Sequence, residues 1–189
     1  MNLKRLIFSL LVLSVVSVSS VAQTDTKNFN GGGVSFDYPN GWVLNDDTNS
    51  DAQQLTLVRP NNDVQIRVFV HKGRIATEKF PDAKKSFIDP YIASTVKQFV
   101  AMGAKPEQSS DSTEIGGAKA DGVKIAANLG EPGAAKIYWA LVGQRVVILT
   151  IFGPDREIKQ FTPAWDTVRN SLKVEDSKAG GSPSPKPSP

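Results

Sequence analysis

Apolar and polar residues alternate along the first half of the chain, which is the pattern of β-strands with one buried face. The alternation begins at residues 34–38 and is clearest at residues 64–71. Phe69 interrupts the polar side of the second stretch and predicts partial cover on that side as well. Shorter apolar runs at 42–44 and 54–59 predict two further strands, bounded by Pro, Asn, Asp and Gly, which favour turns.

A helix is predicted to follow these strands. Asp89 is a typical N-cap residue, and Pro90 suits the first helical position. Gly103 suits the C-cap at the other end. The apolar stripe expected between them consists of Ile92, Val96, Phe99 and Val100. The predicted helix therefore has one buried face.

The second half of the chain repeats this order. Residues 136–142 and 145–152 flank the two-residue loop 143–144, which predicts a hairpin. Within them, residues 138–142 and 146–149 are apolar on both faces, so the two strands should be central. Thr162 and Pro163 then repeat the helix-start signal. The apolar stripe of this second helix consists of Phe161, Trp165, Val168 and Leu172. The hairpin-length connections favour an α+β fold, an α-β-α sandwich with a central, mostly antiparallel sheet covered by helices on both faces.

The connection between the fourth predicted strand and the first helix, residues 72–88, is long. Connections above about 12–15 residues without structure of their own are usually functional or disordered. This one is both basic and apolar, and aromatic and cationic side chains are what an interface anchor requires. The candidate partner-binding residues are Phe80, Lys84, Lys85 and Phe87. The alternative is that the phenylalanines tuck under the loop and fix it to the sheet.

The beginning of the chain has the features of an export signal. Residues 1–22 combine positive charges at Lys4 and Arg5, an apolar stretch shorter than a membrane span, and small residues at Ser20 and Ala22. Cleavage after Ala22 would place the mature protein in the periplasm or outside the cell. We expect no transmembrane segment in the mature chain.

Three further segments are expected after the signal. Residues 23–32 are predicted to be a flexible lead-in, and residues 33–174 to form one domain. Residues 175–189 are rich in Pro and Ser and have no apolar side chain larger than that of Ala179. Such a segment cannot bury enough surface to fold, so it is predicted to be a disordered tail.

Composition excludes several kinds of chemistry. The chain has no Cys and one His, so a thiol nucleophile is absent and a zinc site lacks ligands. The formal charge of +3 falls by two when Lys4 and Arg5 leave with the signal. A net charge this close to zero gives no basis for binding nucleic acid.

Three motifs suggest a ligand, but each has a plainer explanation. The sequence contains no G-x-S-x-G nucleophile elbow whose serine His71 could activate as a base, so we expect His71 to be an ordinary surface residue. Residues 47–51 match the start of a calcium loop, but Ala52 and Val58 stand where Gly and Glu are needed, which indicates a polar turn. The glycines at 31–33 lack the flanking strand and helix of a phosphate-binding loop.

The three tryptophans complete the candidates. Trp42, Trp139 and Trp165 could line a sugar site, but each lies within an apolar pattern typical of a core. We therefore assign no catalytic, cofactor-binding or metal-binding residue, and we expect no cofactor.

Residues 33–42, GVSFDYPNGW, resemble the F-x-Y-P-x-G-W start of PsbP-like domains. The closing helix from Phe161 to Leu172 is similar to the last helix of that family. The resemblance covers the mature domain and implies an α-β-α sandwich. The family includes an extrinsic subunit of photosystem II and many bacterial envelope proteins, and enzymatic activity is not its rule. This chain has no plastid transit peptide, so the resemblance does not extend to a photosystem role.

Two functions stay open at this point. The first is an exported, non-enzymatic module that binds or assists an envelope protein not yet identified. The second is a small-molecule or carbohydrate-binding protein, or an unrecognised hydrolase, with its site on the sheet. A deep pocket with convergent polar groups would favour the second, and a shallow surface with an exposed apolar patch would favour the first.

Overall fold

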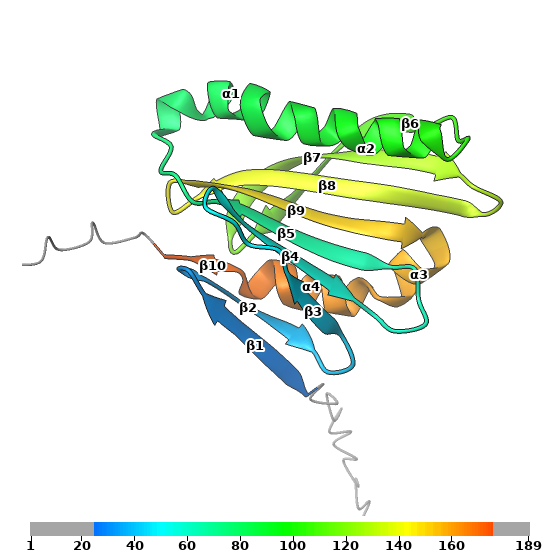
Figure 1. Cartoon of the computed structure of the whole chain (residues 1–189), viewed down its shortest axis with the longest axis horizontal. Coiled ribbons are helices and arrows are strands. Elements are labelled where there is room, and N and C mark those ends of the chain that lie inside the picture. The colour runs from blue at the N-terminus through cyan, green and yellow to red at the C-terminus, as the bar shows by residue number, and fades with distance from the viewer. Residues whose placement is uncertain (1–24, 176–189) are drawn as a thin grey trace, which may run out of the picture.

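The computed structural model describes residues 25–175, which form two antiparallel sheets and two helical segments (Figure 1). The strand order is β1-β2-β10 in the smaller sheet and β3-β4-β5-β9-β8-β7-β6 in the larger one. The smaller sheet contains β1 (Thr26–Gly31), β2 (Val34–Pro39) and β10 (Lys173–Val174). The larger sheet contains β3 (Val43–Asp46), β4 (Ala52–Val58), β5 (Gln65–His71), β6 (Glu107–Ile115), β7 (Ala118–Asn128), β8 (Pro132–Val142) and β9 (Arg145–Pro154).

One helical segment lies between β5 and β6, and a second lies between β9 and β10. The first consists of the 3-10 turn η1 (Thr77–Lys79), α1 (Phe80–Ala83), the π-turn η2 (Lys84–Ile88) and α2 (Asp89–Ala101). The second consists of α3 (Asp155–Gln160) and α4 (Thr162–Ser171). None of the helices within residues 25–175 has the length and apolar character needed to span a bilayer. The predicted signal and most of the predicted tail lie outside the described residues.

Alternate residues of β8 and β9 enter two hydrophobic clusters on opposite faces of the larger sheet. Tyr138 and Leu149 belong to the cluster that contains α4, here called the α4-side cluster. Trp139 and Ile148 belong to the cluster that contains α2, here called the α2-side cluster. Both faces of these strands must therefore be apolar, as the sequence predicts, and the two strands lie in the middle of the sheet.

The predicted sandwich is confirmed in its mixed α+β composition and its mostly antiparallel strands, but the two layers that cover the sheet differ from the prediction. Helix α2 lies on one face (Figure 1). The other face is covered by the smaller sheet together with α3 and α4, since Phe36 of β2 and Trp165 of α4 share the α4-side cluster. Helices alone do not form the second layer.

Residues 26–31 correct the prediction of a flexible lead-in over residues 23–32. They form β1, which pairs with β2 in a register that places Phe29 opposite Phe36, with ring centroids 5.3 Å apart. The strand was missed because Phe29 is its only large apolar residue, so it shows no alternation. Backbone hydrogen bonds to β2 hold these residues in a strand although their sequence lacks the alternating pattern.

The connection at residues 72–88 is also corrected, because it is helical from Thr77 onward. Asp89 lies inside the helix, with φ −61° and ψ −42°, and is not its N-cap. Its N–H donates to the carbonyl of Lys84, a hydrogen bond of the π type. Pro90 has no N–H and cannot continue the α ladder, so a local π-turn accommodates it within the helix.

The predicted end of α2 is confirmed. Gly103 has φ +87°, and its N–H donates to the carbonyl of Val100, while Ala104 donates to Phe99. These two bonds make the Schellman motif that often ends a helix. Val100 was expected on the buried stripe but is 56% exposed, since the helix presents Phe99 to the sheet instead.

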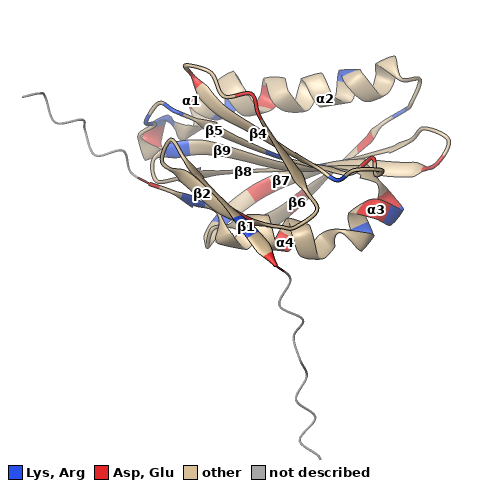
Figure 2. Cartoon of the chain, turned by 60° about the horizontal axis from the view of Figure 1, so that its bottom comes forward, with Lys and Arg blue, Asp and Glu red and all other residues tan. Residues whose placement is uncertain are grey.

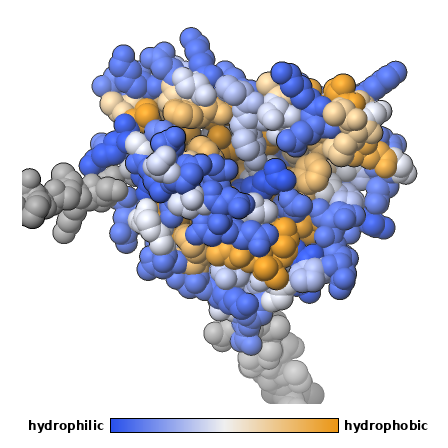
Figure 3. Space-filling model, viewed as in Figure 1, coloured by the Kyte–Doolittle hydropathy of each residue, from blue (hydrophilic) through white to orange (hydrophobic). Residues whose placement is uncertain are grey.

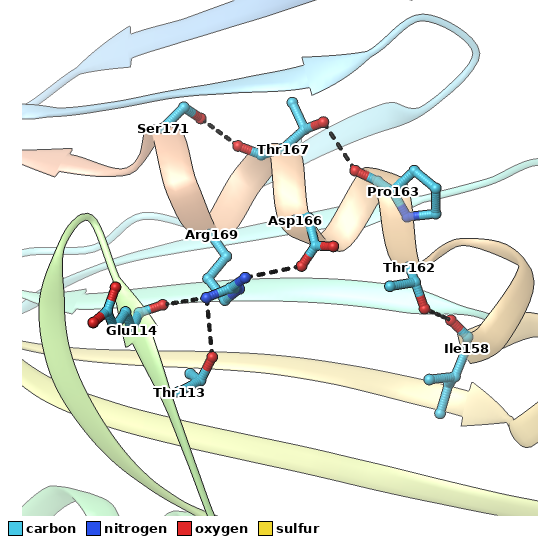
Figure 4. A network of polar contacts seen from close by, with 9 residues as sticks. All are labelled: Thr113, Glu114, Ile158, Thr162, Pro163, Asp166, Thr167, Arg169 and Ser171. Carbon is cyan, nitrogen blue, oxygen red and sulfur yellow. Dashed lines mark hydrogen bonds and ion pairs between the residues drawn. The ribbon is translucent and has the colours of Figure 1, made fainter.

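Arg169 of α4 attaches the helix to the end of β6 (Figure 4). Its Nη1 donates to Thr113 Oγ1 and to the carbonyl of Glu114, and its Nη2 pairs with Asp166 at 3.0 Å. Gly116, just after β6, donates its N–H to the carbonyl of Arg169. The rest of β6 is almost entirely exposed and polar. Only its end is therefore bound to the helical layer.

Candidate functional site

Helix α2 covers only part of its face of the larger sheet (Figure 1). The buried side chains of Ile88 and Phe99 pack with residues of β7, β8 and β9. On the same face of β4, Gln54 is exposed and Thr56 is half-buried. Two adjoining hollows of about 300 and 360 Å³ lie between the helix and this uncovered part of the sheet. We call them together the α2 trough.

Arg67 and Tyr91 line both hollows and therefore mark the middle of the trough. One hollow is completed by Asp47, Gln54, Leu55, Thr56, Val68 and Phe69. The other is completed by Thr95, Gln98, Ala101, Met102, Ala135, Thr150 and Phe152. The trough thus has a helical wall from α2 and a floor from β4, β5 and β9.

A row of hydrogen-bonding side chains crosses this floor at one register. Asn45 of β3 is paired with Thr56 of β4, Thr56 with Arg67 of β5, and Arg67 with Thr150 of β9. Residues directly opposite each other in neighbouring strands project from the same face of a sheet. The hydroxyl of Tyr91 lies 3.1 Å from Thr150 Oγ1, so α2 is joined to the row.

The electrostatics of the trough are dominated by Arg67. Its Nη2 donates to Gln65 Oε1 at 2.9 Å, which orients the guanidinium. Within residues 25–175, no carboxylate lies within ion-pair distance of it. Asp47 lines one hollow, and it has no ion pair with another residue of the described part of the chain. Elsewhere acidic and basic residues are interspersed on the side of the molecule that Figure 2 presents.

Apolar surface occurs at one end of the trough. Met102 at the end of α2 is 51% exposed and Leu129 in the β7–β8 turn is 43% exposed. A smaller hollow of about 200 Å³, lined by Phe99, Leu129 and Phe152, lies beside them. In Figure 3 hydrophobic surface gathers near the right-hand end of α2. The trough therefore leads from a polar middle to an apolar end.

The trough contains groups suited to binding. Arg, Tyr, Thr and Gln side chains supply donors and acceptors, and half-buried Phe69 and Phe152 supply apolar surface. Among the residues that the structure describes, no group of three His, Cys, Asp or Glu side chains is placed to hold a metal ion. The arrangement can orient a ligand by hydrogen bonds and one positive charge.

The four sequence-predicted site residues lie together on α1 and η2, and none of them lines the trough. Phe80 and Phe87 are half-buried and pack against the α2-side cluster, as the structural alternative expected. Lys84 pairs with Asp89 at 2.5 Å, and its amine lies 5.4 Å from the ring centroid of Trp139. Lys85 is exposed. A role for Phe80, Lys84, Lys85 and Phe87 in partner binding stays a prediction.

His71 and the calcium-like motif have local partners. The ring of His71 stacks on Phe87 with centroids 4.4 Å apart, and its Nδ1 lies 3.1 Å from the carbonyl of Gly73. In the 47–51 turn, Asn49 Oδ1 accepts the N–H groups of Asp51 and Ala52. These side chains serve the turn itself, as the polar-turn interpretation expects.

One acidic group beside this turn has a shifted pKa. The side-chain oxygen of Asp46 accepts the N–H of Thr48 at 2.9 Å, and hydrogen bonding to Thr48 lowers the pKa of Asp46. The carboxylate is thereby used to close the turn.

The tryptophans are core residues. Trp42, Trp139 and Trp165 are 2%, 7% and 8% exposed, so none of them offers a ring face for stacking on a sugar. The aromatic side chains that do line the trough are those of Tyr91, Phe69 and Phe152.

Sequence reasoning missed the polar row and Tyr91. A signal existed, because Arg67 stands on the polar side of the alternating stretch 64–71. The pattern does not show which residues lie beside Arg67, because its neighbour Thr150 is 83 residues away along the chain. Only the pairing of β5 with β9 brings the row together.

No protein-family model matches the chain, and no curated protein does so. Among solved structures, the chain is similar to cyanobacterial PsbP (CyanoP) from Synechocystis sp. PCC 6803, with a TM-score of 0.52 and 14% identity over 85% of this chain and 98% of that one. This likeness concerns the fold. The chain has a PsbP-like fold, as its opening motif predicts.

Two further solved structures show weaker likeness. LpqN of Mycobacterium tuberculosis, described as involved in cell envelope biogenesis, has a TM-score of 0.39 and 14% identity over 80% of this chain and 91% of that one. PA94 of Pseudomonas aeruginosa, a protein of unknown function described as a putative regulator, has a TM-score of 0.33 and 13% identity over 75% and 91%. Scores this low add no argument about function.

Proposed function

We propose that this protein is an exported, non-enzymatic module of the cell envelope that holds an extended segment of a partner protein in the α2 trough. The observation that carries the proposal is the polar row, which runs from Asn45, Thr56 and Arg67 on an uncovered part of the sheet to the buried Thr150, where Tyr91 of α2 contacts it. Export is supported by the features of residues 1–22.

The dimensions of the trough support a peptide ligand. From Tyr91 to Met102 the helical wall is about 16 Å long, at 1.5 Å per residue. An extended chain advances about 3.3 Å per residue, so the trough accommodates about five residues. The hydroxyl and amide groups of Thr95, Gln98 and Gln54 line it at intervals, as the backbone of an extended peptide requires.

The chemistry of the trough supports binding over catalysis. General acid–base catalysis needs a titratable pair in reach of one reacting group, and nucleophilic catalysis needs an activated hydroxyl or thiol. The hydroxyls of Tyr91 and Thr150 contact each other, and His71 is turned toward Gly73 and Phe87. These polar groups are arranged to hold a ligand.

Photo-crosslinking in the cells of origin tests the proposal. A benzoylphenylalanine in place of Gln98, which is exposed and lines the trough, should give one main cross-linked product with a partner protein. The same amino acid in place of Ser109, exposed on the edge strand β6, is the matched control and should not give it. Identical product patterns from the two positions would refute the proposal.

A further inference from the structure

We infer that the segment held in the trough is acidic, with a side-chain carboxylate on Arg67 and apolar residues two positions before and after it. This inference rests on the proposed function, and it names what the trough selects.

Within residues 25–175, no carboxylate lies within ion-pair distance of Arg67, although it lines both hollows of the trough. Lys84 pairs with Asp89, Arg156 with Glu131, and Arg169 with Asp166. Arg67 is half-buried, and its Nη2 donates to the neutral side chain of Gln65. A guanidinium has five N–H donors in a planar fork, so most of its hydrogen-bonding capacity remains for a ligand.

The position of Arg67 fits a carboxylate in the middle of a peptide. Both hollows are lined by it, so a chain that runs the length of the trough must pass over it. The register places Thr56 on one side of Arg67 and Thr150 on the other. Thr150 is buried and its hydroxyl contacts Tyr91, whereas Thr56 is half-buried and lines the trough. A carboxylate that accepts two bonds from the guanidinium can therefore accept another from the hydroxyl of Thr56.

The neighbours of Arg67 specify what flanks the acidic residue. Phe69 lines one hollow and Phe152 the other. Phe69 is two residues after Arg67 on β5. Gln65 is two residues before Arg67, and Phe152 of β9 lies opposite Gln65. Side chains two apart on an extended peptide are spaced like these strand positions. The ligand pattern is therefore apolar-x-acidic-x-apolar.

Asp47 limits the acidic character of the ligand to one position. Asp47 lines the hollow that contains Phe69 and therefore lies beside the same peptide. A second acidic residue there would meet a like charge. The trough therefore selects a single acidic residue in an otherwise neutral or weakly basic segment.

A pair of peptides tests the inference on the purified mature protein. The first is acetyl-Leu-Ala-Glu-Ala-Leu-amide, and the second has Gln in place of Glu. Titrations followed by NMR should show that the Glu peptide binds at least about tenfold more tightly, the range expected for hydrogen bonds to a charged group. Its binding should shift the resonances of Arg67 and Tyr91.

Variants assign the preference to Arg67. Arg67→Gln should remove the preference for the Glu peptide, while Arg156→Gln, which changes a side chain that is 69% exposed and outside the trough, should leave it. Asp47→Asn should increase the affinity for the Glu peptide about two- to threefold, because the substitution removes a charge of the same sign as that of the peptide.

The outcomes separate this inference from the proposed function. Equal affinities for the two peptides overturn the acidic preference, and cross-linking at the trough then still supports a protein partner. Failure of both peptides to shift trough resonances at millimolar concentration also overturns the preference. Glucuronate is tested in parallel. If it binds as tightly as the Glu peptide and shifts the same resonances, the trough recognises acidic sugars and both proposals fail.

Discussion

Arg145 is 2% exposed, yet no carboxylate among residues 25–175 pairs with it. Its Nε donates to the carbonyl of His71 at 2.9 Å and its Nη1 to the carbonyl of Gly32 at 3.2 Å. Burial lowers the pKa of Arg145, because no negative charge offsets the loss of water. A single side chain thereby joins β9, the end of β5 and the β1–β2 turn, which lies in the other sheet.

Glu157 performs a similar task at the opposite end of β5. The residue is 6% exposed, and its Oε2 accepts the N–H groups of Asp63 at 2.8 Å and Val64 at 2.9 Å. Glu157→Ala should lower the free energy of unfolding by about 2–3 kcal/mol, because two N–H groups lose a charged acceptor. Chemical denaturation measures this. Glu131→Ala, at a carboxylate that is 45% exposed, is the control and should cost much less.

The buried hydroxyl of Tyr138 should make the folded protein less stable at alkaline pH. Burial, together with a 2.6 Å hydrogen bond to Asp111, raises the pKa of Tyr138 above that of an ordinary tyrosine. Above pH of about 10 the unfolded chain loses this proton and the folded one keeps it, so stability should fall as pH rises. Denaturation at pH 8 to 11 should show the decline, and Tyr138→Phe should reduce its slope. An unchanged slope would contradict the assignment to Tyr138.

At the scale of elements, the helices on the two faces of the larger sheet are fixed in different ways. The β6–β7 hairpin approaches α4 so closely that a Cβ on Gly116 would lie 2.2 Å from the carbonyl oxygen of Leu172. Helix α2 instead rests on half-buried side chains, and Phe99 is its single fully buried residue. The contact between the β6–β7 hairpin and α4 therefore leaves no room for an added side-chain atom. The contact between α2 and the sheet can adjust to small changes.

The hairpin contact gives a matched pair of substitutions. Gly116→Ala should destabilise the protein by more than about 2 kcal/mol, because it adds a clash with backbone to a positive φ of 55°. Gly117 has φ +82°, but a Cβ added there would meet nothing within 4 Å. Gly117→Ala should therefore lower the stability by only about 1 kcal/mol. Thermal melts of both variants measure the difference. Equal losses would mean that the close approach to Leu172 does not constrain the fold.

The helical segment that contains the predicted site residues allows a second comparison. Phe87→Ala should lower stability by about 1 kcal/mol, since half of a large apolar side chain loses its burial. Lys85→Ala should leave stability unchanged, because Lys85 is exposed. If Lys85→Ala weakens partner cross-linking at equal stability, the segment belongs to the interface. If it has no effect, the segment serves the fold alone.

Local sequence patterns predicted most helices and strands, but they could not predict which distant strands pair with each other. The Gly143-Gln144 hairpin was predicted because a two-residue loop between apolar runs is visible in the sequence, and the structure gives these residues positive φ angles of 54° and 58°. Strand β1 was missed because its partner β2, rather than its own residues, makes it a strand. The trough was missed because Thr150 reaches Arg67 only through the pairing of β5 with β9.

At the scale of the whole molecule, one sheet separates two hydrophobic clusters of unequal strength. The α4-side cluster contains three buried residues of the ten-residue α4 and side chains from both sheets. The α2-side cluster receives one fully buried residue from the thirteen-residue α2. Because apolar burial supplies most of a helix's stability in a protein, α2 is held less firmly than α4.

Hydrogen exchange should report this difference. Amides in the middle of α2, such as those of Val96 and Lys97, should exchange faster than that of Val168 in α4. A less stable helix would let the trough adjust its width while β5 and β9 hold Arg67 and Thr150 in place. Equal protection of the two helices would contradict this view of the trough.

Strand β6 ends the larger sheet with residues that are polar and exposed along nearly its whole length. The edge of a sheet can recruit a strand from another molecule and so start aggregation, and polar or charged side chains on the edge oppose this. The apolar strands β8 and β9, which would aggregate most readily, lie in the middle of the sheet. The molecule can therefore present an open trough to a partner while its outer strand β6 resists adding the strands of other chains.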